Sequence, residues 1–180
     1  ATLVAAIFLA VPMLFWLGAA LVALVWLHQD TREGLKVTLW ASLPAVGWMT
    51  AGDPTPLLIL AGCAALALVL RQTIRLDLAL LTGVLFGEVV LFALPALLGE
   101  ILPLVIDATR ESVAASLAAQ PELQVRVLPY VGAVVQGGLA ALHTLVLILC
   151  LLLARHWQAG LFNPGGFGKE FRQLRMPMAY

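Results

Sequence analysis

The sequence predicts an all-α fold: a polytopic transmembrane bundle of five to six membrane helices with one amphipathic interfacial helix. The first reason is composition, because 62% of the 180 residues are hydrophobic and only 11% are charged, with a mean hydropathy of +1.02. In a soluble domain about a quarter of the residues are charged. The second reason is that apolar runs alternate with short polar loops, and about 20 apolar residues can cross a bilayer as a helix. The lipid bilayer is therefore the first expected partner.

The first apolar run covers residues 3–27 and contains Pro12. Proline removes a backbone hydrogen bond and kinks or breaks a helix. We therefore expect either one kinked crossing or two shorter helices that enter and leave the membrane, the latter only where the irregular backbone is buried in protein. Residues 28–36 are polar and are expected to form a loop.

Two shorter apolar runs follow, at residues 37–50 with Pro44 inside and at residues 57–70. A turn rich in glycine and proline, residues 52–56, separates them. Both runs are shorter than the roughly 20 residues that a crossing needs. We expect them to borrow residues from the adjoining turns, or the bilayer to thin around them.

Residues 76–98 form an unbroken apolar run with one acid inside it, and they are predicted to be the central helix, ending near Pro95 and Gly99. In residues 100–126 apolar side chains recur at helical spacing while charged ones lie on other faces. This pattern is typical of an amphipathic helix on the membrane surface. The alternative is an ordinary solvated hairpin. The last long apolar run covers residues 129–154.

Two parts of the chain are therefore predicted: a transmembrane bundle at 1–155, which includes the outer amphipathic segment, and a turn-rich basic tail at 156–180. If the apolar runs alternate in direction, eight Lys and Arg residues lie on one side of the membrane and two on the other. Loops rich in Lys and Arg stay in the cytoplasm. The C-terminus is therefore expected to be cytoplasmic. The eight are Arg32, Lys36, Arg71, Arg75, Arg155, Lys169, Arg172 and Arg175, and the two are Arg110 and Arg126.

Glu88 is the acid inside the central run, and a carboxylate at that depth is costly without a partner, a proton or water. It follows Arg75 by 13 residues, about 20 Å along a helix, and His143 precedes Arg155 by 12 residues, about 18 Å. Equal depth on antiparallel helices predicts an intramembrane polar pair that binds a proton or a polar solute, since histidine titrates near neutral pH. The alternative is a structural contact that joins two helices, worth roughly 1 kcal/mol.

Two more polar residues belong to this predicted site. Gln136 lies two helical turns before His143 on the same face, and Thr82 lies six residues before Glu88, roughly on its side. Several glycines either outline a polar cavity that opens outward or let helices pack closely. These helix-packing positions are Gly83 and Gly87, spaced four apart, and Gly132, Gly137 and Gly138.

Other classes of function find no support in the sequence. The two cysteines, Cys63 and Cys150, lie in apolar runs and are expected to be buried thiols, so no metal site and no cofactor is predicted. No catalytic motif occurs, so no catalytic residue is assigned and the chain is not expected to be an enzyme. A net charge of zero gives no reason to expect a nucleic acid partner. Residues 165–170 look like a phosphate loop, but Glu170 stands where Ser or Thr is needed.

The chain resembles the YybS-like family of bacterial membrane proteins of unknown function. The resemblance rests on the apolar stretch that runs through Pro12 to the loop ending Glu33-Gly-Leu-Lys36, on the amphipathic segment before the last helix, and on the segment Asn163–Pro177. That family is distantly similar to the substrate-binding S components of energy-coupling-factor transporters. The resemblance implies a multi-pass protein of the bacterial inner (cytoplasmic) membrane, with six helices, a split first run and a solute pocket that opens outward.

Two functions remain open. The first is a small-solute binding or transport subunit in which Glu88, His143 and Gln136 line the pocket. The second is a non-catalytic structural or assembly subunit of a larger membrane complex. In that case other membrane subunits are its partners, and they pack in a groove beside Gly83 and Gly87.

Overall fold

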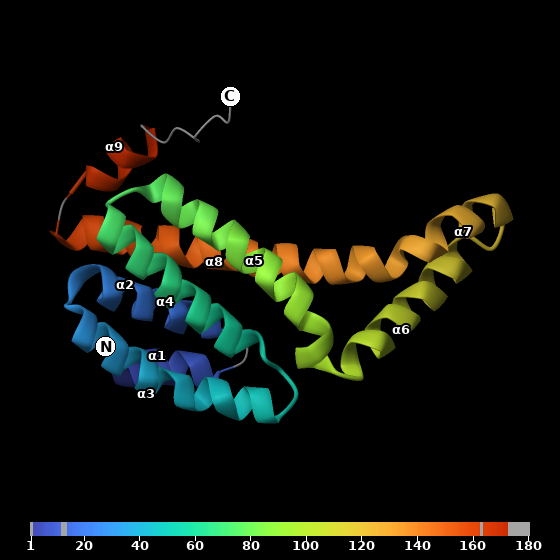
Figure 1. Ribbon diagram of the computed structural model, residues 1–180, viewed down its shortest axis with the longest axis horizontal. Coiled ribbons are helices and arrows are strands. Elements are labelled where there is room, and N and C mark those ends of the chain that lie inside the picture. The colour runs from blue at the N-terminus through green and yellow to red at the C-terminus, as the bar shows by residue number, and fades with distance from the viewer. Residues whose placement is uncertain (1, 12–13, 163, 173–180) are drawn as a thin grey trace. The chain divides into compact units, whose positions relative to one another are not determined.

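The computed structural model describes residues 2–11, 14–162 and 164–172, and every regular element in these ranges is a helix (Figure 1). The all-α prediction is therefore confirmed for this part of the chain. Residues 173–180 of the predicted tail, including Arg175, lie outside the described residues. The chain divides into two compact units, one made of residues 1–86 and 144–180 and the other of residues 87–143.

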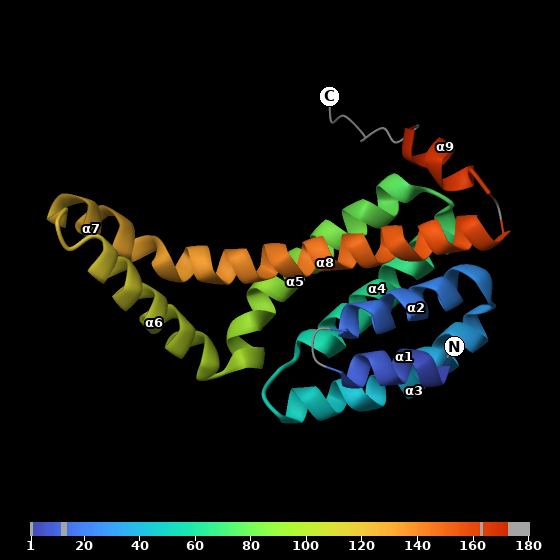
Figure 2. The same ribbon diagram turned by 180° about the vertical axis from the view of Figure 1, so that it is seen from behind.

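The first apolar run forms two helices, α1 (Thr2–Ala10) and α2 (Phe15–His28). Of the two arrangements that Pro12 left open, the split run is the one observed. With nine residues, α1 is about 14 Å long and cannot cross a bilayer alone. Both helices pack against α3 (Thr31–Thr50), and α2 also packs against α4 (Thr55–Thr73), as the views from opposite sides show (Figures 1 and 2).

The helix α3 corrects the predicted loop at residues 28–36, because it begins at Thr31. The Asp30 carboxylate accepts a hydrogen bond from the Glu33 backbone N–H at 2.9 Å, which satisfies one of the unpaired donors of the first turn. Glu33 also forms an ion pair with Lys36 one turn later. Because these local contacts let the helix begin at Thr31, α3 is 20 residues long. It continues through Pro44.

The central helix α5 (Leu76–Leu98) has the predicted bounds. It continues through Pro95 and stops before Gly99, whose φ of 49° lies in the left-handed region that glycine adopts most easily. Ile74 and Arg75 connect α4 to α5, and Ile74 is itself left-handed with φ 55°. Asp77 in the first turn of α5 pairs with Arg75 at 2.6 Å.

In the second unit, α6 (Ile101–Ser116) and α7 (Pro121–Val127) form a helical hairpin. The Gln124 amide donates to the Ala114 carbonyl at 2.7 Å and connects the two helices. Segment 100–126 therefore consists of two helices separated at residues 117–120, and its location on the membrane surface stays a prediction. The short helix η1 (Leu128–Tyr130) then leads into α8 (Val131–Phe162).

The last helix is longer than its apolar run, because α8 continues to Phe162 where the sequence placed the start of a turn-rich tail at residue 156. No glycine-proline turn interrupts the chain before Pro164, so nothing stops the helix earlier. The Phe162 ring stacks on His28 at 3.8 Å between ring centroids, which joins the end of α8 to the end of α2. A short helix, α9 (Gly166–Arg172), follows.

Among the described residues, three helical stretches are long and apolar enough to cross a membrane: α4, α5 and the continuous stretch Pro121–Phe162. They contain 19, 23 and 42 residues: the first two are near the roughly 20 residues that a bilayer crossing requires, and the third is about twice that length. Length and composition thus identify a membrane-embedded helical protein. The core of the first unit is built from small and aliphatic side chains, with Ala19, Ala20 and Ala23 of α2 fully buried, so helices approach closely.

Candidate functional site

Glu88 lies on the exposed face of α5 and not in the protein interior. In the second unit the exposed positions of α5 recur at helical spacing, and we call this surface the Glu88 face. Glu88 is its only polar residue, and Val89 and Phe92 are 63% and 78% exposed. No hydrogen bond or ion pair of Glu88 occurs in the described part of the chain. The face consists of Glu88, Val89, Phe92, Pro95 and Ala96.

His143 of α8 is buried, with 7% of its surface exposed. Its Nδ1 lies 2.8 Å from the Leu139 carbonyl oxygen one turn earlier, so Nδ1 carries the proton and donates it to that oxygen. The other ring nitrogen, Nε2, is buried and has no hydrogen-bond partner among the described residues. Nε2 is therefore a free acceptor for a proton or a hydrogen bond.

The structure does not join Glu88 to His143, since one is exposed, the other is buried, and no hydrogen bond connects them. Of the four predicted polar residues, only Gln136 reaches another helix, where its Nε2 donates to the Leu91 carbonyl of α5 at 2.8 Å. The Thr82 hydroxyl donates to the Leu78 carbonyl of its own helix. Gln136 thus makes the kind of contact that joins two helices.

The predicted packing glycines fall into two groups. A Cβ on Gly83 would lie 3.2 Å from Leu66 Cδ2 and 3.5 Å from Ile148 Cγ1, so this glycine allows α4 and α8 to approach α5. A Cβ on Gly132 would lie 3.7 Å from Ile106 Cγ2 of α6. Gly87 is buried. Gly137 and Gly138 have no such neighbour within 4 Å. This chain itself supplies the neighbours of Gly83, and a partner beside Gly83 and Gly87 stays a prediction.

A second polar cluster lies where α2 and α4 end, and sequence reasoning missed it. Six residues line a cavity of about 170 Å³, which we call the two-arginine cavity. The signal available in the sequence was a basic residue at the end of two apolar runs, Arg71 and Arg155, which we used only for orientation. The cavity is lined by Leu27, Leu70, Arg71, Ile74, Arg155 and Gln158.

The polar side chains of this cavity hold the last turn of α2. Arg71 Nη1 donates to the carbonyls of Trp26, at 3.2 Å, and Gln29, and Gln158 Nε2 donates to the Leu27 carbonyl at 2.9 Å. The last carbonyls of a helix have no partner within it, so these bonds satisfy them. Arg155 Nη1 donates to the Gln158 Oε1 and completes the chain of contacts.

Comparisons with known proteins were made by family, by sequence and by fold. No family model, curated protein or solved structure matches this chain. The resemblance to the YybS-like family therefore stays a prediction that rests on the residues quoted for it.

The first unit also has two apolar grooves, of about 410 and 450 Å³. Both are lined by residues of α2 and α8, and apart from His156 their walls are aliphatic, aromatic, glycine or thiol. A site for a polar solute combines apolar walls with several placed polar groups. These grooves suit hydrocarbon better than a polar solute.

Within residues 2–11, 14–162 and 164–172, no group of three or more His, Cys, Asp or Glu side chains could hold a metal ion. Cys63 and Cys150 are buried free thiols, as the sequence predicted. The chemistry that the arrangement offers is therefore ionic and hydrogen-bonding: a carboxylate on an apolar face, a free imidazole nitrogen in the interior and two guanidinium groups at one end of the first unit.

Proposed function

We propose that this chain is a non-catalytic subunit of a larger complex in the bacterial inner membrane, and that the Glu88 face of α5 contacts its partner. The observation that carries the proposal is the exposure of Glu88 on an otherwise apolar face of a helix long enough to cross a bilayer. Glu88 is 12 residues from Leu76 and 10 from Leu98, so it lies about 18 and 15 Å from the two ends of the helix, near its middle.

A carboxylate that faces lipid at mid-membrane is expensive, and such residues are found facing protein, water or an opposite charge. The neighbours of Glu88 on its face are all apolar, so this chain does not supply the compensation. A helix of another membrane subunit that presents a basic or hydrogen-bond-donating side chain does supply it. The apolar residues around Glu88 then pack against that helix.

The orientation of the chain belongs to the same proposal. Basic residues gather on one side of the first unit: at the start of α3, at the end of α4, just before α5 and at Arg155. We assign this side to the cytoplasm from the bias of Lys and Arg. The C-terminus is then cytoplasmic, and the turns at residues 52–54 and 117–120 face outward.

The Glu88→Leu variant tests the proposal. We expect native purification in mild detergent to retain a membrane protein with the wild-type chain and to lose it with Glu88→Leu. Removal of one member of a desolvated charged pair costs about 2 kcal/mol or more, a factor of about 30 in affinity. Mass spectrometry of the retained material is the measurement.

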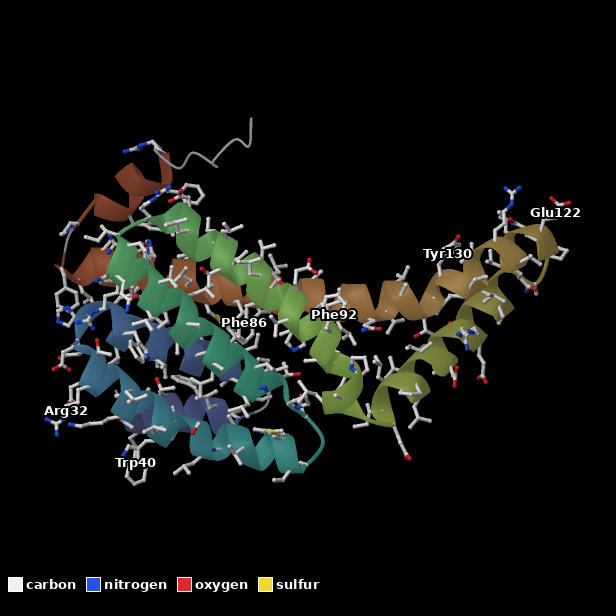
Figure 3. All side chains as sticks on the ribbon, in the orientation of Figure 1. Arg32, Trp40, Phe86, Phe92, Glu122 and Tyr130 are labelled. Atoms are coloured by element: carbon white, nitrogen blue, oxygen red, sulfur yellow. The ribbon has the colours of Figure 1, made fainter. Side chains whose placement is uncertain are left out.

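Glu122→Leu is the matched control, because Glu122 is an exposed carboxylate in the first turn of α7 (Figure 3). It should retain the partner. The purified Glu88→Leu chain should also be at least as heat-stable as the wild type, since nothing within the chain depends on this carboxylate. Equal retention of the partner by Glu88→Leu and Glu122→Leu would contradict the proposal.

A small-solute binding or transport subunit is the second candidate, and one observation favours it. His143 Nε2 is a buried acceptor with no partner, which a solute donor group could occupy. Gln136, two turns earlier on the same helix, is already committed to the Leu91 carbonyl. The same purification separates the two functions, because a retained metabolite that depends on His143 supports the solute subunit and a retained protein that depends on Glu88 supports the complex.

A further inference from the structure

We propose that the two-arginine cavity binds a phosphate group, carried either by an anionic phospholipid or by a free phosphate compound. The inference does not depend on the partner of α5, since every residue of the cavity belongs to the first unit.

The first step is the geometry of Arg71. A guanidinium has five N–H groups, and those on Nη1 point to the carbonyls of Trp26 and Gln29. In the part of the chain that the structure describes, Nε and Nη2 of Arg71 make no hydrogen bond. Arg71 is therefore held in place by one edge and offers its other donors to a ligand. A guanidinium fixed in this way matches two oxygens of a phosphate.

The second step is charge. The carboxylates on the adjacent segments make their hydrogen bonds elsewhere: Asp30 with the Glu33 N–H, Glu33 with Lys36, and Asp77 with Arg75. The hydrogen bond and the charge of Asp77 raise the pKa of Arg75, so that pair is already matched. Arg71 instead bonds only carbonyl oxygens.

The helix ends at the cavity carry charge of the opposite sign, which must be compared with that of the arginines. The C-termini of α2 and α4 each carry about half a negative charge. The charge of Arg71 offsets these helix ends, and Arg155 also lines the cavity. Because the unused groups of Arg71 are N–H donors, they favour a ligand that presents acceptor oxygens, such as an anion, over a cation.

The third step is space and strain. The cavity of about 170 Å³ holds a phosphate group together with water, because one water needs only about 10–15 Å³ of such space. Ile74 forms part of its wall, is 85% exposed and has a left-handed backbone. A branched residue in that conformation stores strain, and strain of this kind gathers at ligand sites.

The experiment measures heat stability of the full-length chain in neutral detergent, because a ligand that binds only the folded state raises it. Three probes are titrated: inorganic phosphate, glycerol 3-phosphate and micelles that contain phosphatidylglycerol. Diacylglycerol micelles are the lipid control without phosphate. Stabilisation by the phospholipid alone identifies a lipid headgroup, and stabilisation by the soluble probes as well identifies a free phosphate compound.

The variants are Arg71→Gln and Arg155→Gln, with Arg32→Gln as the control. Arg32 is exposed at the same end of the first unit and points away from it (Figure 3). We expect each cavity variant to weaken the apparent affinity about tenfold or more and the control to change it less than about twofold. Arg155→Gln keeps the bonds of Arg71 to α2, so it remains informative if Arg71→Gln fails to fold.

Three results would overturn the proposal. The first is no stabilisation by any phosphate probe. The second is an affinity of the folded cavity variants equal to that of Arg32→Gln. The third is equal stabilisation by diacylglycerol and phosphatidylglycerol, because the phosphate would then contribute nothing.

Discussion

Ile74 has a left-handed backbone at the point where α4 ends, a place where glycine is the usual residue. For a side chain branched at Cβ this conformation costs roughly 1–2 kcal/mol. Little packing offsets that cost, because the side chain is 85% exposed. The connection to α5 therefore retains a strained residue beside the two-arginine cavity.

We predict that Ile74→Gly raises the free energy of unfolding by about 1 kcal/mol, since glycine adopts the left-handed region without a steric penalty. Thermal or denaturant unfolding of the purified chain in detergent measures it. Gln72→Gly is the control, because Gln72 is exposed in the last turn of α4, where glycine costs up to about 0.5–1 kcal/mol. If both variants lose stability by the same amount, Ile74 is not strained.

Glu88 and His143 show that a sequence reveals the depth of a residue along a helix but not the direction of its side chain. Depth along a helix follows from counting residues, because each adds about 1.5 Å. The direction in which a side chain points depends on which neighbours pack around the helix, and one sequence does not give that. Glu88 proved to be exposed and His143 buried, so equal predicted depth did not bring them into contact.

Among the helices, the bounds could be predicted where an apolar run ends at a strong stop signal, and they were wrong where a cap decides the start of the helix. The run 76–98 became α5 with the same bounds, because Gly99 stops it. The start of α3 was placed too late, because Thr31–Lys36 is polar and looked like a loop. The cap formed by Asp30 and Glu33 was present in the sequence, and it outweighs the polarity of that turn.

The space around two glycines predicts opposite effects of a glycine-to-alanine substitution on stability. A Cβ on Gly62 of α4 would lie 2.5 Å from Leu147 Cδ2 and 3.1 Å from Phe86 Cε1, whereas one on Gly137 of α8 has no such neighbour within 4 Å. We predict that Gly62→Ala destabilises the chain because Leu147 must move. Gly137→Ala should stabilise it by up to about 1 kcal/mol, because alanine is the better helix former.

Unfolding of the two purified variants under identical conditions measures this contrast. The pair is matched in chemistry, so the difference between them reports the space around each glycine. Equal effects of Gly62→Ala and Gly137→Ala would mean that α4 and α8 do not approach as closely as the contact at Leu147 requires.

For the whole molecule, the distribution of basic residues makes the decisive prediction about orientation. The end of α4 and the start of α5 carry Arg71 and Arg75, while the turns after α3 and α6 carry no Lys or Arg. Helices that cross a membrane keep their basic ends in the cytoplasm. We therefore predict the orientation in which both of these turns, which lack Lys and Arg, are outside.

Single cysteines test this orientation in intact cells, with a maleimide that does not cross the membrane. The positions are exposed: Ala51→Cys and Ala119→Cys in the two turns, and Gln72→Cys at the end of α4. We expect the first two to react from outside and Gln72→Cys to react only after the membrane is opened. Cys63 and Cys150 are 0% and 1% exposed, so the background should be low. Labelling of Gln72→Cys from outside, with Ala51→Cys protected, would invert the chain and place the two-arginine cavity on the outer side.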